Sequence, residues 1–295
     1  MCLLRSNISF FFILFITVYC SYTKQQLSYY EEDNRPTCIT DMDFQNARYG
    51  RVFNGQNAKM NDFRFVVAIM MNYQPICAAT LITERHSMTA AHCLYGASFF
   101  IGFMTLNIGA YDLRTNKEVT NYLRKIKRYY LHPEYLSRNS NNDICIIEFS
   151  PPVHLGKDLK AIALPPQNIQ PIPYTPCIVW GWGRTSYKGS TPSILQRADL
   201  MIVSKERCQE SSRIRSTKTV ICAAGSNGES PCNGDSGSAL LVQINNFYVA
   251  YGITSYGSAT CKTNNLPAFF TDVSKYINWI YDLTREADCK PRIYT

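Results

Sequence analysis

Three short segments carry side chains that could together perform nucleophilic catalysis. They are Thr89-Ala90-Ala91-His92-Cys93, Asn142-Asp143-Ile144 and Gly234-Asp235-Ser236-Gly237. A serine hydroxyl is a poor nucleophile until a neighbouring base removes its proton, and neutral imidazole is the base whose pKa suits neutral pH. A single His, Asp or Ser is more often a surface or core residue than a catalyst, so the signal lies in the three segments together.

The composition indicates a folded, secreted protein. The chain has 295 residues, of which 46% are hydrophobic and 18% charged, and this excludes a disordered or fibrous protein. A net charge of +8 is a modest bias over this length and does not indicate a nucleic-acid partner. Twelve cysteines without a CxxC pair indicate a disulfide-bonded domain from an oxidising compartment.

The N-terminus predicts a secretory signal peptide over residues 1–20. Arg5 precedes an apolar run from Ile8 to Cys20, which is shorter than the ~20 residues needed to span a bilayer. An uncleaved membrane anchor is the alternative interpretation. No later segment is long and apolar enough to span a membrane, so we expect a secreted, extracellular protein with no membrane partner.

The elements that must position the three segments are predicted to be short strands. From Val52 onward, β-branched and aromatic runs separated by turn residues indicate an all-β fold. These runs include residues 65–70, 143–149, 177–180 and 248–253. A proline-rich stretch near 160–176 predicts a seam between two halves. One helix is expected near the C-terminus, where apolar residues recur at helical spacing from Val273 to Leu283, with Asp272 or Ser274 as N-cap.

In this order and context, the three segments resemble those of the chymotrypsin-like (trypsin-fold) serine proteases, and the match runs from Arg51 to about Glu286. The resemblance implies two six-stranded antiparallel β-barrels packed face to face, with a C-terminal α-helix. It also implies a peptidase domain over 52–286, followed by a C-terminal tail over 287–295. In style, the segments are most similar to those of insect secreted and venom-type serine proteases.

The family's roles carry over to the matching residues. His92 is expected to act as general base and acid, Asp143 to orient and stabilise its ring, and Ser236 to attack and carry the acyl group. The backbone N–H groups of Gly234 and Ser236 are the expected oxyanion hole. We expect no cofactor and no metal, because ligand-like spacings are absent and the cysteines should be oxidised.

By resemblance, Ser230 lies at the base of the primary specificity pocket, where trypsin-like enzymes have an aspartate. Gly257 and Ala268 are expected on its walls, and Ser255 and Tyr256 beside the bound substrate. The neighbouring Glu229 is expected to point away from the pocket. An arginine substrate would lose solvation in a neutral pocket with little return, so we predict cleavage after Phe, Tyr, Leu or Met.

Tyr49-Gly50-Arg51-Val52 resembles the family's activation junction, which makes residues 21–51 a propeptide. Cleavage after Arg51 would free the amino group of Val52, which in the family folds inward onto the aspartate before the nucleophile, here Asp235. Because the predicted pocket is neutral, the enzyme should not cut its own junction. The expected partners are therefore protein or peptide substrates, an upstream trypsin-like activating protease, and protein inhibitors.

Most of the cysteines are assigned to disulfides by the family resemblance. Three pairs are expected: Cys77 with Cys93, Cys208 with Cys222, and Cys232 with Cys261. With Cys2 and Cys20 assigned to the signal peptide, four cysteines are left over, namely Cys38, Cys145, Cys177 and Cys289, and the sequence allows all three of their pairings. Cys38 lies where chymotrypsin-type zymogens tether their propeptide, but the expected partner position is occupied by Ala163. Cys145 could equally be a buried thiol.

Two rival functions remain open. A catalytically inactive homologue could act as a binding or regulatory protein, although such proteins usually lack the serine or histidine. A second possibility is an enzyme with a basic exosite for an acidic partner or glycan. The candidate residues for that exosite are Arg124, Lys125, Lys127 and Arg128, together with Arg213, Arg215 and Lys218. A solvated charged face is the simpler interpretation of this group.

Overall fold

The computed structural model describes residues 33–38, 56–115, 121–185, 189–211, 218–226, 228–245, 247–258, 261 and 266–294. The predicted signal peptide, the Arg51–Val52 junction, Arg213 and Arg215 lie outside the described residues. The chain divides into a unit of residues 1–36, in which Arg35 forms an ion pair with Asp33, and a unit of residues 37–295, which contains all of the described strands. Among the described residues, no helix has the length and apolar character needed to cross a membrane.

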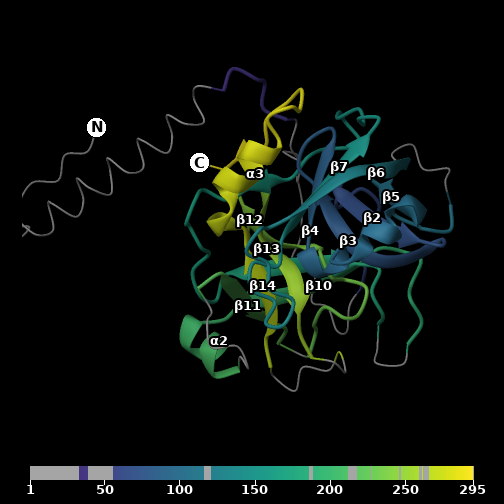
Figure 1. Ribbon diagram of the computed structural model, residues 1–295. Helices are drawn as coiled ribbons and strands as arrows, with labels where there is room; N and C mark the ends of the chain where they lie inside the picture. Colours follow the sequence, from purple (N-terminus) through teal and green to yellow (C-terminus); the bar gives the residue numbers. More distant parts are fainter. Residues whose placement is uncertain are drawn as a thin grey trace, which may run out of the picture. The chain divides into compact units, whose positions relative to one another are not determined.

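The first half of the second unit is a closed six-stranded antiparallel barrel, seen in blue and teal in Figure 1. Its strands are β2 (Val66–Met71), β3 (Gln74–Leu81), β4 (His86–Thr89), β5 (Met104–Ile108), β6 (Tyr122–Leu131) and β7 (Cys145–Ser150). They pair in the order β2-β3-β4-β7-β6-β5, and β2 also pairs with β5, which closes the ring. Side chains from β2, β4 and β7 are almost completely buried and fill its interior.

The second half forms another barrel, in which six strands close through the pairing of β12 with β13. These strands are β9 (Pro176–Gly181), β10 (Gln196–Ile202), β11 (Val220–Ala224), β12 (Ala239–Ile244), β13 (Phe247–Tyr256) and β14 (Ala268–Asp272). Three two-residue strands extend this sheet: β1 (Gln56–Asn57), β8 (Ala163–Leu164) and β15 (Arg292–Ile293). The predicted fold of two six-stranded barrels is therefore confirmed.

Aromatic side chains join the two barrels. Phe65, immediately before β2, is fully buried and its ring lies 6.3 Å from that of Trp180 and 6.4 Å from that of Tyr248. Phe63 adds a third contact, 5.6 Å from Tyr248. Buried aromatic pairs in tilted or edge-to-face geometry stabilise an interface beyond their apolar area. This packing fixes the relative position of the loops that meet between the barrels.

The predicted C-terminal helix forms in two pieces. A short 3₁₀ turn, η4 (Val273–Lys275), is followed by α3 (Ile277–Leu283), and the apolar residues at 273, 276, 277 and 280 are all buried. Asp272 caps the first turn by accepting the backbone N–H of Ser274 at 3.1 Å. A second helix, α2 (Lys205–Ser211), is not predicted by the sequence pattern. It buries only Cys208 and therefore shows no apolar stripe.

Candidate active site

The three chemistry-bearing segments meet between the barrels. His92 lies in η1 (Ala91–Cys93), a 3₁₀ turn that follows β4 of the first barrel, and Asp143 lies just before β7 of the same barrel. The second barrel contributes Ser236, in the turn before β12, and Ser255, near the end of β13. The site is thus assembled from the loops and strand ends of two separately closed sheets.

Asp143 is completely buried, and both of its carboxylate oxygens accept hydrogen bonds. The backbone N–H of His92 donates to Oδ1 at 2.8 Å, and Nδ1 of the same residue lies 2.8 Å from Oδ2. Ser255 Oγ also donates to Oδ2 at 2.5 Å. An ionised carboxylate only accepts hydrogen bonds, so Nδ1 carries the ring proton when the imidazole is neutral. Nε2 then has a free lone pair, on a side chain that is one-third exposed.

Two further hydrogen bonds position the Asp143 segment, and the sequence does not reveal the residues that donate them. Thr271 Oγ1 in β14 donates to the Asp143 carbonyl oxygen at 2.9 Å. The hydroxyl of Tyr276 donates to the side-chain oxygen of the adjacent Asn142 at 2.8 Å. Thr271 belongs to the second barrel and Tyr276 to the C-terminal helical segment that follows it, so both act on the Asp143 segment from outside the first barrel. Their distance in the sequence leaves no local signal for this role.

Ser236 is held beside the His92 turn through its backbone. The Ala78 N–H donates to the Ser236 carbonyl oxygen at 2.8 Å, and the sulfur of Cys93 lies 3.7 Å from the same oxygen. The next residue, Gly237, has φ +87°, and a side chain there would collide with the Ala78 carbonyl. Glycine at 237 thus permits the close approach that brings the serine to the histidine segment.

A glycine is also needed at position 234. Its φ of +103° belongs to the region that side chains disfavour, and an added Cβ would lie 3.0 Å from the Cα of Gly183. The adjacent Asn233 carbonyl accepts the Arg184 N–H at 2.9 Å, which ties this turn to the end of β9. The backbone of the predicted oxyanion loop is therefore anchored on both sides of Gly234.

Asp235, which is half-buried, is the second carboxylate of the site. It accepts the backbone N–H of Gly183 at 2.7 Å and that of Cys232 at 2.9 Å. Burial raises its pKa to about 6, although these two hydrogen bonds act in the opposite direction. A Cβ on Gly181 or Gly183 would collide with the carboxylate, so both glycines make room for it. Among the described residues, no lysine or arginine forms an ion pair with Asp235.

A cavity of about 90 Å³ adjoins Asp235 and is also lined by Glu229 and Ser230. Glu229 is only 4% exposed, and its carboxylate lies close to Gly225. The cavity is not lined by Gly257 or Ala268, so the orientation of Glu229 relative to the specificity pocket stays a prediction. The hydroxyl of Ser230 donates to the Pro231 carbonyl oxygen at 3.2 Å.

The two predicted pocket walls face each other. A Cβ added to Gly257 would lie 3.7 Å from that of Ala268, which is ordinary van der Waals contact. Tyr256 stacks on Phe269, with ring centroids 4.5 Å apart and planes 9° from parallel. Its ring therefore packs partly on the hydrophobic cluster beneath the strand.

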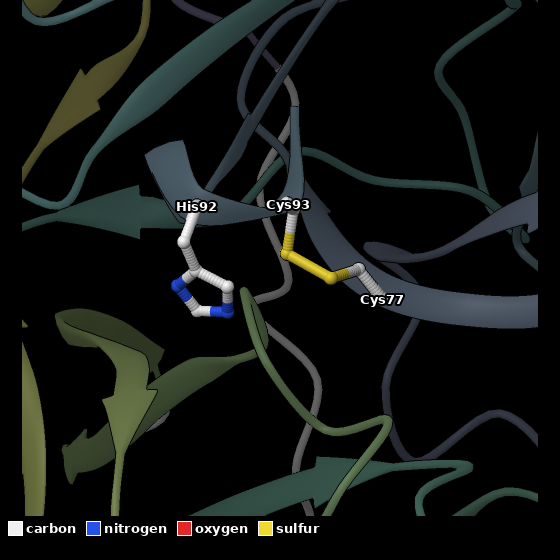
Figure 2. A group of neighbouring side chains, drawn as sticks. All are labelled: Cys77, His92 and Cys93. Atoms are coloured by element: carbon white, nitrogen blue, oxygen red, sulfur yellow. A yellow bond between two sulfur atoms is a disulfide. The ribbon is translucent and has the colours of Figure 1, made fainter. Parts of the chain in front are cut away.

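Neither group of potential metal ligands among the described residues fits a metal ion. In the first, Cys77, His92 and Cys93 place their ligand atoms within 4.8 Å of one another, but the two sulfurs form a disulfide, as Figure 2 shows. The second group, Cys38, Glu84 and Cys289, also contains a disulfide. A disulfide sulfur cannot supply the thiolate that a zinc site needs.

The structure contains the three expected disulfides, and a fourth joins Cys38 to Cys289. The sequence leaves three ways to pair the remaining four cysteines in two bonds, and the structure forms none of them in full because it contains only this one bond. Cys145 and Cys177 are buried free thiols, and burial raises the pKa of both well above the ordinary value. Thiols in this state are poor nucleophiles and fit a packing role.

A family model described as Trypsin matches residues 52–280. Mouse chymotrypsin-C is 32% identical over 240 residues, which cover 78% of this chain and 87% of that protein. The chain belongs to the trypsin family. Its membership and its relatives make it a serine protease, in agreement with the family resemblance of its motifs.

Solved structures agree with this trypsin-family fold. Neuropsin, a serine protease expressed in the limbic system of mouse brain, matches with a TM-score of 0.70 and 26% identity, covering 78% of this chain and 98% of that one. Human heparin binding protein also matches with a TM-score of 0.70, covering 81% of this chain and all of that one. At 24% identity, the second match supports the fold alone.

Proposed function

We propose that this protein is a secreted serine endopeptidase, made as a zymogen, that cleaves peptide bonds through an acyl-enzyme on Ser236. The observation that carries the proposal is the hydrogen-bonded group around Asp143, which orients the His92 ring and leaves Nε2 available as a base. The Ser236 backbone is fixed beside that histidine by Ala78. A nucleophile, a base and an orienting carboxylate are the components that acyl transfer requires.

In the proposed reaction, Ser236 Oγ attacks the substrate carbonyl carbon while His92 Nε2 takes the hydroxyl proton. The resulting oxyanion is stabilised by the N–H groups of Gly234 and Ser236. When the carbon–nitrogen bond breaks, His92 returns the proton to the leaving amine, and the acyl group stays on Ser236. A water molecule then repeats the sequence, again with His92 as base, and releases the carboxylic acid.

Activation would act on Asp235. Cleavage after Arg51 would create an ammonium group at Val52, and the cavity beside Asp235 is the proposed receptor for it. A carboxylate whose pKa is raised to about 6 by burial is stabilised when a positive charge is brought next to it. Filling this cavity would order the loop that carries Gly234 and complete the oxyanion hole.

The proposed specificity is for Phe, Tyr, Leu or Met before the cleaved bond. The neutral Ser230 supports this preference, and Ala268 should make the pocket slightly shallower. Glu229 is buried next to Ser230, and a carboxylate directed into the specificity pocket would instead favour a positively charged substrate side chain. Similarity to a protein named chymotrypsin-C supports the apolar preference.

A fluorophosphonate probe tests the proposal, because an activated serine displaces its fluoride and becomes phosphonylated. Residues 21–295 should label weakly until they are cut after Arg51, and then label strongly with Val52 as the new N-terminus. Ser236→Ala is the control and should not label after cutting. Absence of labelling in the correctly cut wild type would favour the inactive binding homologue. Full activity in an uncut Arg51→Gln protein would refute the zymogen mechanism.

Peptides that differ only at the residue before the scissile bond test the specificity. We expect kcat/KM for Phe and Leu to exceed that for Arg. If Arg is preferred, Glu229→Gln decides whether the buried carboxylate is responsible, since the isosteric amide removes the charge and keeps the shape.

A further inference from the structure

Aromatic side chains protrude from two separate loops at one end of the first barrel. Tyr73, at the tip of the β2–β3 hairpin, is 95% exposed. Two 3₁₀ turns, η2 (Ala97–Phe99) and η3 (Ile101–Phe103), present Phe99 and Phe103 at 89% and 69% exposure. Because Met71 pairs with Met104, the hairpin tip and the end of η3 lie at the same end of the barrel. A group of exposed aromatic side chains of this kind marks an interaction surface.

Positive charge lies directly beside this aromatic rim, which we define as Tyr73, Phe99, Phe100 and Phe103. The turn η3 contacts β6, and Thr105 pairs with Lys125. Met104 is buried, whereas Phe103 and Thr105 on either side of it are not, so these two residues face outward. Lys125 and Lys127 are also exposed, and an irregularity in the strand pairing between Ile126 and Arg128 lets Lys127 and Arg128 reach the same carboxylate, that of Glu148.

The charged groups of β6 differ in how firmly they are held. Lys127 and Arg128 pair with Glu148 at 2.5 and 3.7 Å, but Glu148 is itself buried beneath them. The Arg124 guanidinium donates to the Pro151 carbonyl oxygen, which fixes it along the strand. Lys125 forms no ion pair with any described residue. The outward face of β6 is therefore positive, with three cations over one buried carboxylate and Arg124 at its edge.

We propose that the aromatic rim and the outer face of β6 together dock this protein onto an anionic lipid surface. Aromatic rings enter the headgroup region of a bilayer while neighbouring lysines bind the anionic headgroups. The rings project from loop tips, whereas a site for a peptide or small ligand is normally concave. An anionic glycan would also use the lysines, and the phenylalanine variants described below separate it from a lipid surface.

Docking of this kind would place a lipid surface close to His92. The loop that carries Phe99 and Phe103 continues directly from the His92 turn, where the Tyr95 N–H donates to the Ala91 carbonyl oxygen at 2.9 Å. The proposal differs from the sequence-based expectation of no membrane partner. A sequence reveals the aromatic residues but not which of them remain outside the core.

Co-sedimentation with vesicles of phosphatidylcholine, with and without phosphatidylserine, tests the proposal on residues 21–295. We expect binding only when phosphatidylserine is present. Lys125→Glu should weaken binding about tenfold, as should Phe99→Ser combined with Phe103→Ser. The control is Ile172→Ser, which removes a 75% exposed apolar side chain between β8 and β9 and should leave binding unchanged. A thermal melt of each variant shows that it is folded.

Several results would overturn the proposal. One is the absence of sedimentation with either vesicle. Another is equal binding to both vesicles, which would exclude recognition of the anionic headgroup. A third is binding to heparin or to a polyglutamate peptide without binding to vesicles, where the phenylalanine variants bind the polymer as well as the wild type does. That result would assign β6 to an acidic glycan or polypeptide instead.

Discussion

Asp143 and Asp235 are two carboxylates of the same site with very different surroundings, the first fully buried and the second half-buried. Asp143 accepts hydrogen bonds from His92 and Ser255, including one from a ring that can become positively charged. Asp235 accepts only backbone N–H groups in the described structure, and burial raises its pKa to about 6. The acid–base pair is thus already assembled in the full chain, whereas the Asp235 region lacks a positive partner among the described residues. Activation should therefore change the oxyanion loop and leave the His92–Asp143 pair as it is.

The largest effect is expected at Asp143. Asp143→Asn should lower kcat of the cut protease by about 10⁴, because the amide can donate to Nδ1 and favour the wrong ring tautomer. Ser255→Ala removes one donor to the same carboxylate and should cost only about tenfold. Steady-state kinetics on one peptide measures both. Equal losses in the two variants would contradict the view that Asp143 acts on the ring while Ser255 supports it.

A smaller effect is expected at Asp235. In the cut protease, Asp235→Asn should lower kcat/KM by about 10² to 10³, the usual cost of an incomplete oxyanion hole. The uncut chain should show no comparable change, because its hole is not yet formed. Wild-type activity in the cut variant would show that the Val52 ammonium does not act through this carboxylate.

The pH dependence of the free energy of unfolding tests the surroundings of Asp235 separately from its role in activity. The pKa of Asp235 is raised in the folded chain, so the folded state retains a proton that the unfolded state has already lost. Its contribution to stability is therefore most favourable below pH 4 and declines as the pH rises to about 6, by about 3 kcal/mol. Urea unfolding of the uncut wild type should show this decline, and Asp235→Asn should lack it.

Much of the fold and the candidate site could be predicted, because the information is local in the sequence. The runs at 65–70 and 248–253 lie in β2 and β13, except that Phe65 immediately precedes β2, and the apolar stripe from Val273 predicts the last helix. Short motifs are enough to assign the triad residues, and the structure brings their segments together. Their catalytic roles and the insect-type similarity stay predictions.

What the sequence could not reveal depends on long-range packing. Cys38 and Cys289 are 251 residues apart, and their pairing follows from where the C-terminal tail lies. The tail forms β15, which runs parallel to β8 and pairs Arg292 with Ala163. This brings Cys289 into the region of Ala163, the position at which the family resemblance places the partner of Cys38. The burial of Glu229 likewise depends on how its loop folds onto Gly225.

The smallest effect on activity is expected from the Cys38–Cys289 disulfide, which tethers residues 21–51 to the rest of the chain. The Cys38 N–H donates to the Lys290 carbonyl oxygen at 2.9 Å, and Glu84 accepts the Asp288 N–H at 2.8 Å, so the disulfide lies in an ordered part of the structure. Cleavage after Arg51 should leave residues 21–51 attached through Cys38 as a light chain. Cys289→Ser should release that chain on cutting while changing kcat/KM by less than about twofold, because the disulfide lies outside the His92 and Asp235 regions.

Mass spectrometry with and without reductant measures the retention of this light chain. The cut wild type should have the mass of both chains without reductant and separate into two species with it. Cys38→Ser is the matched variant and should behave like Cys289→Ser, since either change removes the same bond. Loss of residues 21–51 from the unreduced wild type would show that the tether does not survive activation. A large drop in kcat/KM in both variants would show instead that the light chain supports the oxyanion loop, which would link the tail to the Asp235 region.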